Sequence, residues 1–123
     1  MNHARLFLAV EAISFGAAAL VHAGWLASGY EHREAAIAES VIAGVLTLGL
    51  AASLLAPASS RAIALAVQAF ALLGTMVGVF TMVIGVGPQS AFDIALHAGF
   101  IALLIAGLTV VARRSADYAP RRV

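Results

Sequence analysis

The chain contains no cysteine and no lysine, and charged side chains of every kind make up only 11% of its 123 residues. Without cysteine it has neither disulfides nor thiolate ligands for a metal ion. With a formal net charge of +1 it lacks the basic surface that holds nucleic acid, so we expect no nucleic-acid partner. It has no phosphate-binding loop and no nucleophile beside a general base, which favours a protein that is not an enzyme.

Hydrophobic residues make up 63% of the chain, far above their share in soluble domains. Four apolar segments each come close to the ~20 residues that span a bilayer: 5–27, 35–56, 61–85 and 91–112. A backbone in lipid must satisfy its own hydrogen bonds, so these segments are predicted helices, and their short connections make neighbours antiparallel. The sequence therefore predicts an all-α polytopic membrane protein, with residues 1–123 forming one antiparallel four-transmembrane-helix bundle.

The first segment shares one feature with a secretory signal peptide. Val21-His22-Ala23 looks like a cleavage site with small residues at its ends. Glu11, however, interrupts the apolar run that precedes it. This favours a span that is retained in the membrane.

The arginines predict the orientation of the bundle. Six of them fall at one predicted end, with only Arg33 at the other: Arg5, Arg61, Arg113, Arg114, Arg121 and Arg122. Because positive charge is retained in the cytoplasm, both termini are predicted to be cytoplasmic, with 113–123 as a basic tail that meets anionic lipid. The arginine-only, alanine-rich composition fits a bacterium with a GC-rich genome, so we expect the bacterial cytoplasmic (inner) membrane. Lipid is the expected partner, and a homo-oligomer or a partner membrane protein stays open.

The other ionisable side chains gather at the predicted outer end. His22 lies near the end of the first span, Glu39 near the start of the second, and Asp93 and His97 open the fourth at positions i and i+4. Polar groups in a membrane turn toward protein, so these four are predicted to converge in a pocket, with His32 above them as a gate or extra ligand. Imidazoles and carboxylates suit a divalent metal ion such as Zn²⁺, which takes three or four nitrogen and oxygen ligands.

Several of these residues also have plainer interpretations. Ser90 and Asp93 fit a capping box at the start of the fourth helix. His22 fits an interfacial histidine bonded to a backbone carbonyl, and His32 fits a solvated helix start. A haem held by His22 and His97 is a further alternative, which the neighbouring carboxylates disfavour.

A second polar layer is predicted nearer the cytoplasm. The third span carries a polar or soft side chain every seven residues, which is typical of an inward-facing seam: Arg61, Gln68, Thr75 and Met82. An unpaired carboxylate in hydrocarbon is costly, so Glu11 is expected to be protonated or hydrogen-bonded, with Gln68 or Ser14 as partner. Gly74 and Gly78 form a GxxxG that lets another helix approach closely. The predicted intramembrane polar residues are Glu11, Gln68 and Thr75.

The stretch GVGPQSAFDIALHAGFIALLIAGL, 85–108, resembles the last span of small uncharacterised bacterial four-helix integral membrane proteins with a GxGPxSxxDxxxH pattern. This resemblance implies a fold and a membrane location, but no activity. The chain is also similar in size to four-helix proteins of the DoxX type and to the small multidrug resistance transporters, although it lacks the characteristic motifs of the latter.

Three functions stay open at this point. The first is binding of a metal ion or cofactor at the outer pocket. The second is a structural or accessory membrane subunit whose histidines anchor helix ends. The third is proton-coupled transport of a small molecule that uses Glu11, as small four-helix antiporters use one membrane carboxylate.

Overall fold

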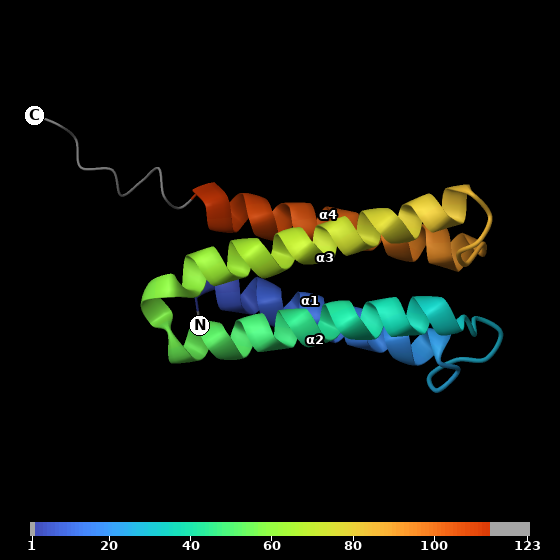
Figure 1. The fold of residues 1–123 in the computed structure, drawn as a ribbon, viewed down its shortest axis with the longest axis horizontal. Helices are drawn as coiled ribbons and strands as arrows, with labels where there is room; N and C mark the ends of the chain where they lie inside the picture. The colour runs from blue at the N-terminus through green and yellow to red at the C-terminus, as the bar shows by residue number, and fades with distance from the viewer. Residues whose placement is uncertain (1, 114–123) are drawn as a thin grey trace, which may run out of the picture.

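The computed structural model describes residues 2–113. The chain forms α1 (His3–His22), α2 (Arg33–Leu55), a short 3₁₀ helix η1 (Pro57–Ser59), α3 (Ser60–Val83) and α4 (Ala91–Arg113), and the described residues include no strand. The four α-helices run antiparallel to their neighbours in the chain (Figure 1). Each is long and apolar enough to cross a membrane. The predicted all-helical fold with four such helices is therefore confirmed.

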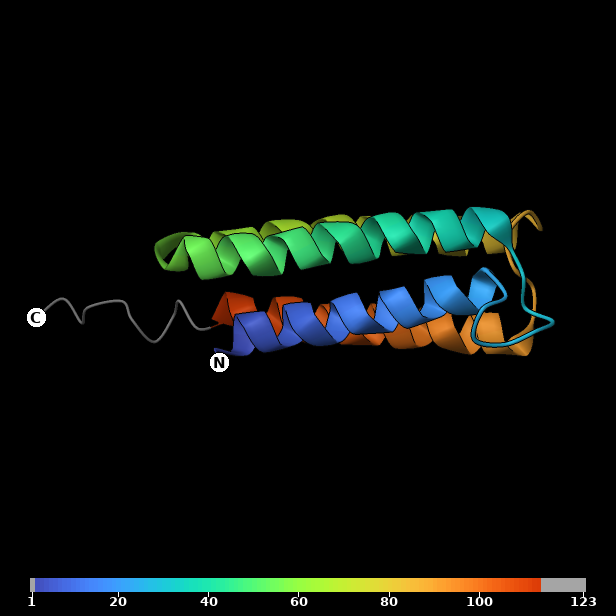
Figure 2. The same cartoon turned by 90° about the horizontal axis from the view of Figure 1, so that it is seen from below.

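The two ends of the bundle differ in what they carry. The loops α1–α2 and α3–α4 lie at one end, here called the loop end (Figure 1). The start of α1, the end of α4 and η1 lie at the other, here called the terminal end. Figure 2 shows that α2 and α3 form one layer of the bundle and α1 and α4 the other. The side chains between these layers form the interior.

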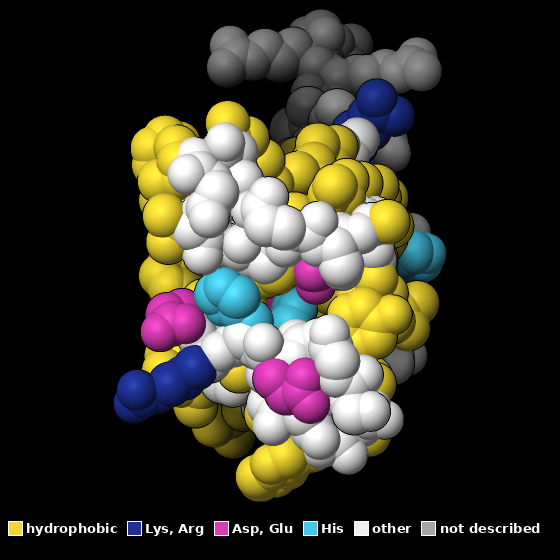
Figure 3. All heavy atoms as spheres, turned by 90° about the vertical axis from the view of Figure 1, so that its right-hand side faces the viewer, with side chains coloured by type: hydrophobic (Ala, Val, Ile, Leu, Met, Phe, Trp, Pro, Cys, Tyr) yellow, Lys and Arg dark blue, Asp and Glu magenta, His cyan; other side chains and the backbone are white. Residues whose placement is uncertain are grey.

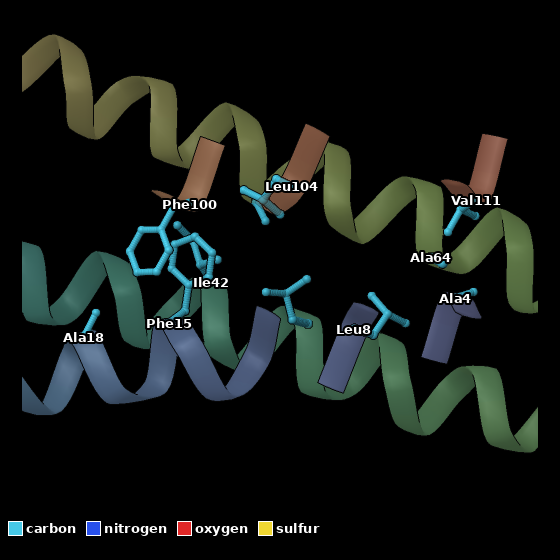
Figure 4. Close-up of a cluster of buried hydrophobic side chains, with 11 residues drawn as sticks. Ala4, Leu8, Phe15, Ala18, Ile42, Ala64, Phe100, Leu104 and Val111 are labelled. Atoms are coloured by element: carbon cyan, nitrogen blue, oxygen red, sulfur yellow. The ribbon is translucent and has the colours of Figure 1, made fainter. Parts of the chain in front are cut away.

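Inward-facing residues follow a seven-residue repeat. On α1 the buried positions, apart from Ala19, alternate in steps of four and three: Ala4, Leu8, Glu11, Phe15, Ala18 and His22. On α4 they do the same: Asp93, His97, Phe100, Leu104, Gly107 and Val111. Such spacing is typical of helices that pack knobs into holes along one seam. Near the middle of the core the rings of Phe15 and Phe100 stack with centroids 4.0 Å apart (Figure 4).

The outer surface of the described bundle is apolar, unlike that of a soluble bundle. Large aliphatic side chains point outward, with Ile13 72%, Leu48 71% and Leu73 67% exposed. The interior packs apolar side chains such as Leu8, Leu46 and Leu104. Among residues 2–113 it also buries nine polar or charged residues: Glu11, His22, Glu39, Ser53, Ser60, Gln68, Thr75, Asp93 and His97. A soluble monomer rarely exposes so continuous an apolar surface. This surface suits lipid.

The predicted end of the first helix at 27 is wrong, because α1 ends at His22. Gly24 adopts a positive φ of 78°, and Trp25 N donates to Leu20 O while Gly24 N donates to Val21 O. These two bonds form a Schellman cap, which glycine favours because a side chain would be strained there. The apolar residues up to 27 continue the hydrophobic run, so composition alone does not locate this cap.

Arginines at the terminal end close two helices. Arg5 Nη2 donates to Ser53 O at 2.6 Å near the end of α2. Arg61 donates to Val111 O at 3.2 Å and to Ala112 O at 3.1 Å near the end of α4. Cations at helix C-termini satisfy free carbonyls and complement the helix dipole. Apart from Arg113, the predicted basic tail lies outside the described residues.

Candidate functional site

Three of the predicted site residues meet in one hydrogen-bonded row at the loop end. His22 Nδ1 lies 2.7 Å from Glu39 Oε2, and His22 Nε2 lies 2.9 Å from Asp93 Oδ1. The three side chains, here called the loop-end triad, come from α1, α2 and α4 and are all buried. The alternative of a backbone carbonyl as partner of His22 is wrong, since carboxylates occupy both ring nitrogens.

The triad has a definite count of protons. A carboxylate only accepts hydrogen bonds, and a ring nitrogen donates only when it carries a hydrogen. Two hydrogen bonds along the row therefore need two hydrogens. Either an imidazolium stands between two carboxylates, or a neutral imidazole stands between one carboxylate and one carboxylic acid. In both cases the triad carries one net negative charge.

The second oxygen of Asp93 forms the predicted capping box. Asp93 Oδ2 accepts from Ser90 N at 3.0 Å and from Ser90 Oγ, while Ser90 Oγ accepts from Asp93 N at 3.1 Å. An aspartate in the first turn also favours the positive end of the helix dipole. The two interpretations of Asp93 thus hold together, because one oxygen caps α4 and the other holds His22.

His97 lies one turn further along α4 and faces α3. Its Nδ1 lies 2.9 Å from Asp93 O, and since a carbonyl only accepts, Nδ1 carries a hydrogen. In the neutral ring, Nε2 then presents a lone pair, for which residues 2–113 offer no hydrogen-bond partner. A Cβ added at Gly78 would lie 2.9 Å from that Nε2. The glycine of α3 therefore makes room for the imidazole.

The GxxxG of α3 does not face a single helix. Gly74 lies against Ile42 of α2, whereas Gly78 lies against His97 of α4. Each glycine accommodates a side chain of a different neighbour.

His32 caps the start of α2 and links it to the opposite loop. Its Nδ1 accepts from Ala35 N at 3.3 Å, and its Nε2 lies 3.3 Å from Val86 O. Because Nδ1 accepts, Nε2 carries the hydrogen and donates to the carbonyl. His32 also lines a cavity beside the triad, and its role as a gate or extra ligand stays a prediction.

A cavity of about 150 Å³ opens beside the triad. Here called the loop-end pocket, it has a lining that includes Phe15, His32, Glu34, Glu39, Ile42, Thr75, Gly78, Val86, Pro88, His97 and Phe100. Figure 3 shows histidine side chains in the middle of this end of the molecule, close to acidic ones and between flanks of hydrophobic side chains. Glu39 Oε1 is buried and has no hydrogen-bond partner among the described residues. Glu39 and His97 both line this pocket. Among residues 2–113, neither Glu39 Oε1 nor His97 Nε2 has a hydrogen-bond partner.

The deeper polar layer contains a second buried contact. Gln68 Nε2 donates to Glu11 Oε1 at 2.8 Å, so Gln68 is the partner of Glu11, while Ser14 Oγ donates to Val10 O within its own helix. Thr75 likewise donates to Ala71 O at 2.8 Å. Glu11 and Gln68 are here called the deep pair.

The predicted metal ligands are not arranged around a common coordination site. Among residues 2–113, no group of three or more His, Asp or Glu side chains is arranged to hold a metal ion. His22 and Asp93 use their polar atoms on each other and on Ser90 and Glu39. Ligation of zinc or haem iron by His22 would need one of these bonds to break. Both the metal site and the haem site stay predictions.

Sequence reasoning placed Gly78 in a helix-packing motif and missed the other small and aromatic residues that shape the site. Gly78 admits His97, Gly107 lies against the deep pair, and Phe15 and Phe100 line the pocket. A signal for two of them was present. Phe100 and Gly107 follow Asp93 at intervals of seven residues, so they share the inward face that Asp93 marks.

Comparison with known proteins adds no further constraint. No protein-family model, no curated protein and no solved structure matches the chain. The function is therefore argued from the geometry of the loop-end pocket and of the deep pair.

Proposed function

We propose that this chain is a multi-pass protein of the bacterial cytoplasmic membrane that binds a small cation in the loop-end pocket. The observation that carries the proposal is one cavity lined by both Glu39 and His97, where Glu39 Oε1 is buried and has no hydrogen-bond partner among the described residues. A buried acceptor without a donor is unfavourable, so the pocket favours a ligand that brings N–H groups or positive charge. The net negative charge of the triad has the same effect.

Two kinds of cation fit these acceptors, and the cavity favours the organic one. The sequence predicted a divalent metal ion, which would take Glu39 and His97 as ligands with water completing its coordination. The cavity of about 150 Å³ has largely apolar walls, including Phe15, Ile42 and Phe100. Small-molecule sites combine apolar walls with a few placed polar groups. A protonated amine with a short carbon chain therefore satisfies both parts of the pocket.

Binding is tested on the tag-free protein in mild detergent by isothermal titration calorimetry with a series of alkylammonium ions and with Zn²⁺. We expect an alkylammonium ion to bind, and Glu39→Gln to weaken binding at least tenfold. Glu31→Gln is the matched control, because Glu31 is an exposed carboxylate near the start of α2 that does not line the pocket. If Zn²⁺ binds at one ion per chain and this binding is lost in His97→Ala, the ligand of the pocket would be assigned as a metal ion and not as an amine. Binding of neither cation would refute the proposal.

Membrane insertion and orientation are part of the proposal. The apolar outer surface supports insertion, and the arginines at the terminal end support cytoplasmic termini with the loop end outside. Since the chain has no cysteine, single cysteines report topology directly. Ser28→Cys in the α1–α2 loop should react with a membrane-impermeant maleimide in intact cells, and Ala58→Cys in η1 only after permeabilisation. The reverse pattern would place the pocket on the cytoplasmic side.

A second candidate, proton-coupled transport, is favoured by a different observation. Glu11 is fully buried within the bundle, and its Oε2 has no partner among residues 2–113. An ionisable residue within a membrane span commonly marks a proton or ion pathway. Glu11→Gln should then abolish pH-driven uptake in proteoliposomes while the calorimetric affinity of the loop-end pocket stays unchanged. Uptake that survives Glu11→Gln would exclude this candidate.

A further inference from the structure

The deep pair is short of hydrogen-bond donors. Glu11 and Gln68 are both fully buried and share one hydrogen bond, from Gln68 Nε2 to Glu11 Oε1. The two remaining oxygens, Glu11 Oε2 and Gln68 Oε1, have no partner among the described residues. If Glu11 were ionised, both oxygens would be acceptors that face no donor. Leaving buried polar groups unsatisfied costs free energy, and more so when one of them is charged.

One hydrogen on Glu11 removes both deficits. A carboxylic acid O–H donates, and Gln68 Oε1 is the unpartnered acceptor on the same neighbour. We infer that Glu11 is a proton-binding site, at which its carboxylic acid and the Gln68 amide form a closed pair with two hydrogen bonds. The ligand is the proton itself. The inference stands on the deep pair alone and does not depend on cation binding at the loop-end pocket.

The surroundings of the pair favour the neutral form. On their own helices Glu11 and Gln68 are flanked by apolar inward residues: Leu8 and Phe15 on α1, Ala64 and Ala71 on α3. From α4, the backbone at Gly107 covers the pair so closely that an added Cβ would overlap both Gln68 Nε2 and Glu11 Oε1. An ionised carboxylate here would have the single Gln68 donor to replace its hydration. A carboxylic acid needs no more than the amide provides.

The bound proton has a structural consequence. It completes the polar contact between α1 and α3 under α4, so the packed bundle binds the proton more tightly than an opened bundle does. Stability is therefore fully present when the proton is bound and is lost as rising pH removes it. Opening of α1 away from α3 and α4 would let water reach Glu11 and exchange the proton.

Infrared spectroscopy of the full chain in lipid tests this site. At neutral pH we expect a carboxylic-acid C=O band that moves in D₂O and is lost in Glu11→Gln. The matched control is Glu39→Gln, because the loop-end triad can also hold an acid and must not be mistaken for Glu11. The thermal stability of the unaltered chain should fall from neutral to alkaline pH, and that of Glu11→Gln should fall less, since an amide cannot ionise.

Two outcomes would overturn the inference. The first is a Glu11→Gln spectrum that loses an ionised carboxylate band and leaves the acid region unchanged. The second is stability that depends on sodium concentration and not on pH, which would assign a metal cation to the pair. If Glu11→Gln does not fold, the same question is answered with the Glu39→Gln variant labelled with ¹³C-glutamate. The label shifts the carboxylic-acid band of a protonated Glu11. An acid band that does not shift would exclude a protonated Glu11. None of these measurements depends on the pocket ligand, so failure here is distinct from failure of cation binding.

Discussion

Asp93 has two separable structural roles. We therefore expect its replacement by alanine to lower the free energy of unfolding more than replacement of its capping partner, Ser90. Ser90→Ala removes the cap that accepts from Asp93 N and should cost about 1 kcal/mol. Asp93→Ala removes the reciprocal cap and also the 2.9 Å contact with His22 Nε2. Losing a buried hydrogen bond that involves a charged group adds about 2 kcal/mol. We therefore expect a loss of about 3 kcal/mol for Asp93→Ala and about 1 kcal/mol for Ser90→Ala.

The difference between the two variants is the quantity to measure. It amounts to about 2 kcal/mol, or roughly thirty-fold in the unfolding equilibrium constant. Reversible unfolding with rising dodecyl sulfate in mixed micelles gives the free energy of unfolding from helical circular dichroism. The fluorescence of Trp25, the only tryptophan, reports the loop end in the same titration. Equal losses for Ser90→Ala and Asp93→Ala would show that the contact with His22 contributes nothing, and the triad would then not be a structural unit.

Three further variants follow from close contacts of single residues. Gly107→Ala places a methyl group on the deep pair and should cost about 1–3 kcal/mol of unfolding free energy. Gly99→Ala on the same helix should cost none, because a Cβ added there meets nothing. Equal effects of the two variants in the micelle titration would contradict the packing of α4. Gly78→Ala places a methyl group against His97 and should weaken the calorimetric affinity of the loop-end pocket for an alkylammonium ion at least tenfold. An unchanged affinity would show that His97 takes no part in binding. Arg61→Gln removes the donors to the last carbonyls of α4 and should speed hydrogen exchange in its last turn, with no change at the loop end; slower or unchanged exchange there would deny the arginine a capping role.

The sequence predicts the helices well because two signals agree. Apolar length sets the four spans, and recurrence every seven residues marks the inward faces. Glu11 and Gln68 illustrate this, because depth and helical direction alone bring them together as predicted. The orientation of the bundle in a membrane stays a prediction, since it rests on arginine placement.

The details that composition cannot supply are those set by backbone geometry. The first helix ends at His22 and not at 27, because the positive φ of Gly24 closes it within an apolar run. Likewise, Gly78 and Gly107 are important because they have no Cβ. Only the packed structure shows that a methyl group at these positions would overlap a neighbouring side chain. The sequence predicted that His22 and Asp93 lie at the same depth. It could not show that the His22 imidazole bridges two carboxylates, so that neither of its ring nitrogens is free for a metal ion.

The start of α4 determines the chemistry of the pocket through a connected row of hydrogen bonds. Ser90 fixes one oxygen of Asp93, and this directs the other toward His22. His22, held at one ring nitrogen, bonds to Glu39 Oε2 through the other, and Glu39 Oε1 is left without a partner among residues 2–113. The aspartate in the first turn of an apolar helix is therefore more than a cap. It orients a buried acceptor on another helix, so Asp93→Ala should weaken cation binding even though Asp93 does not line the loop-end pocket.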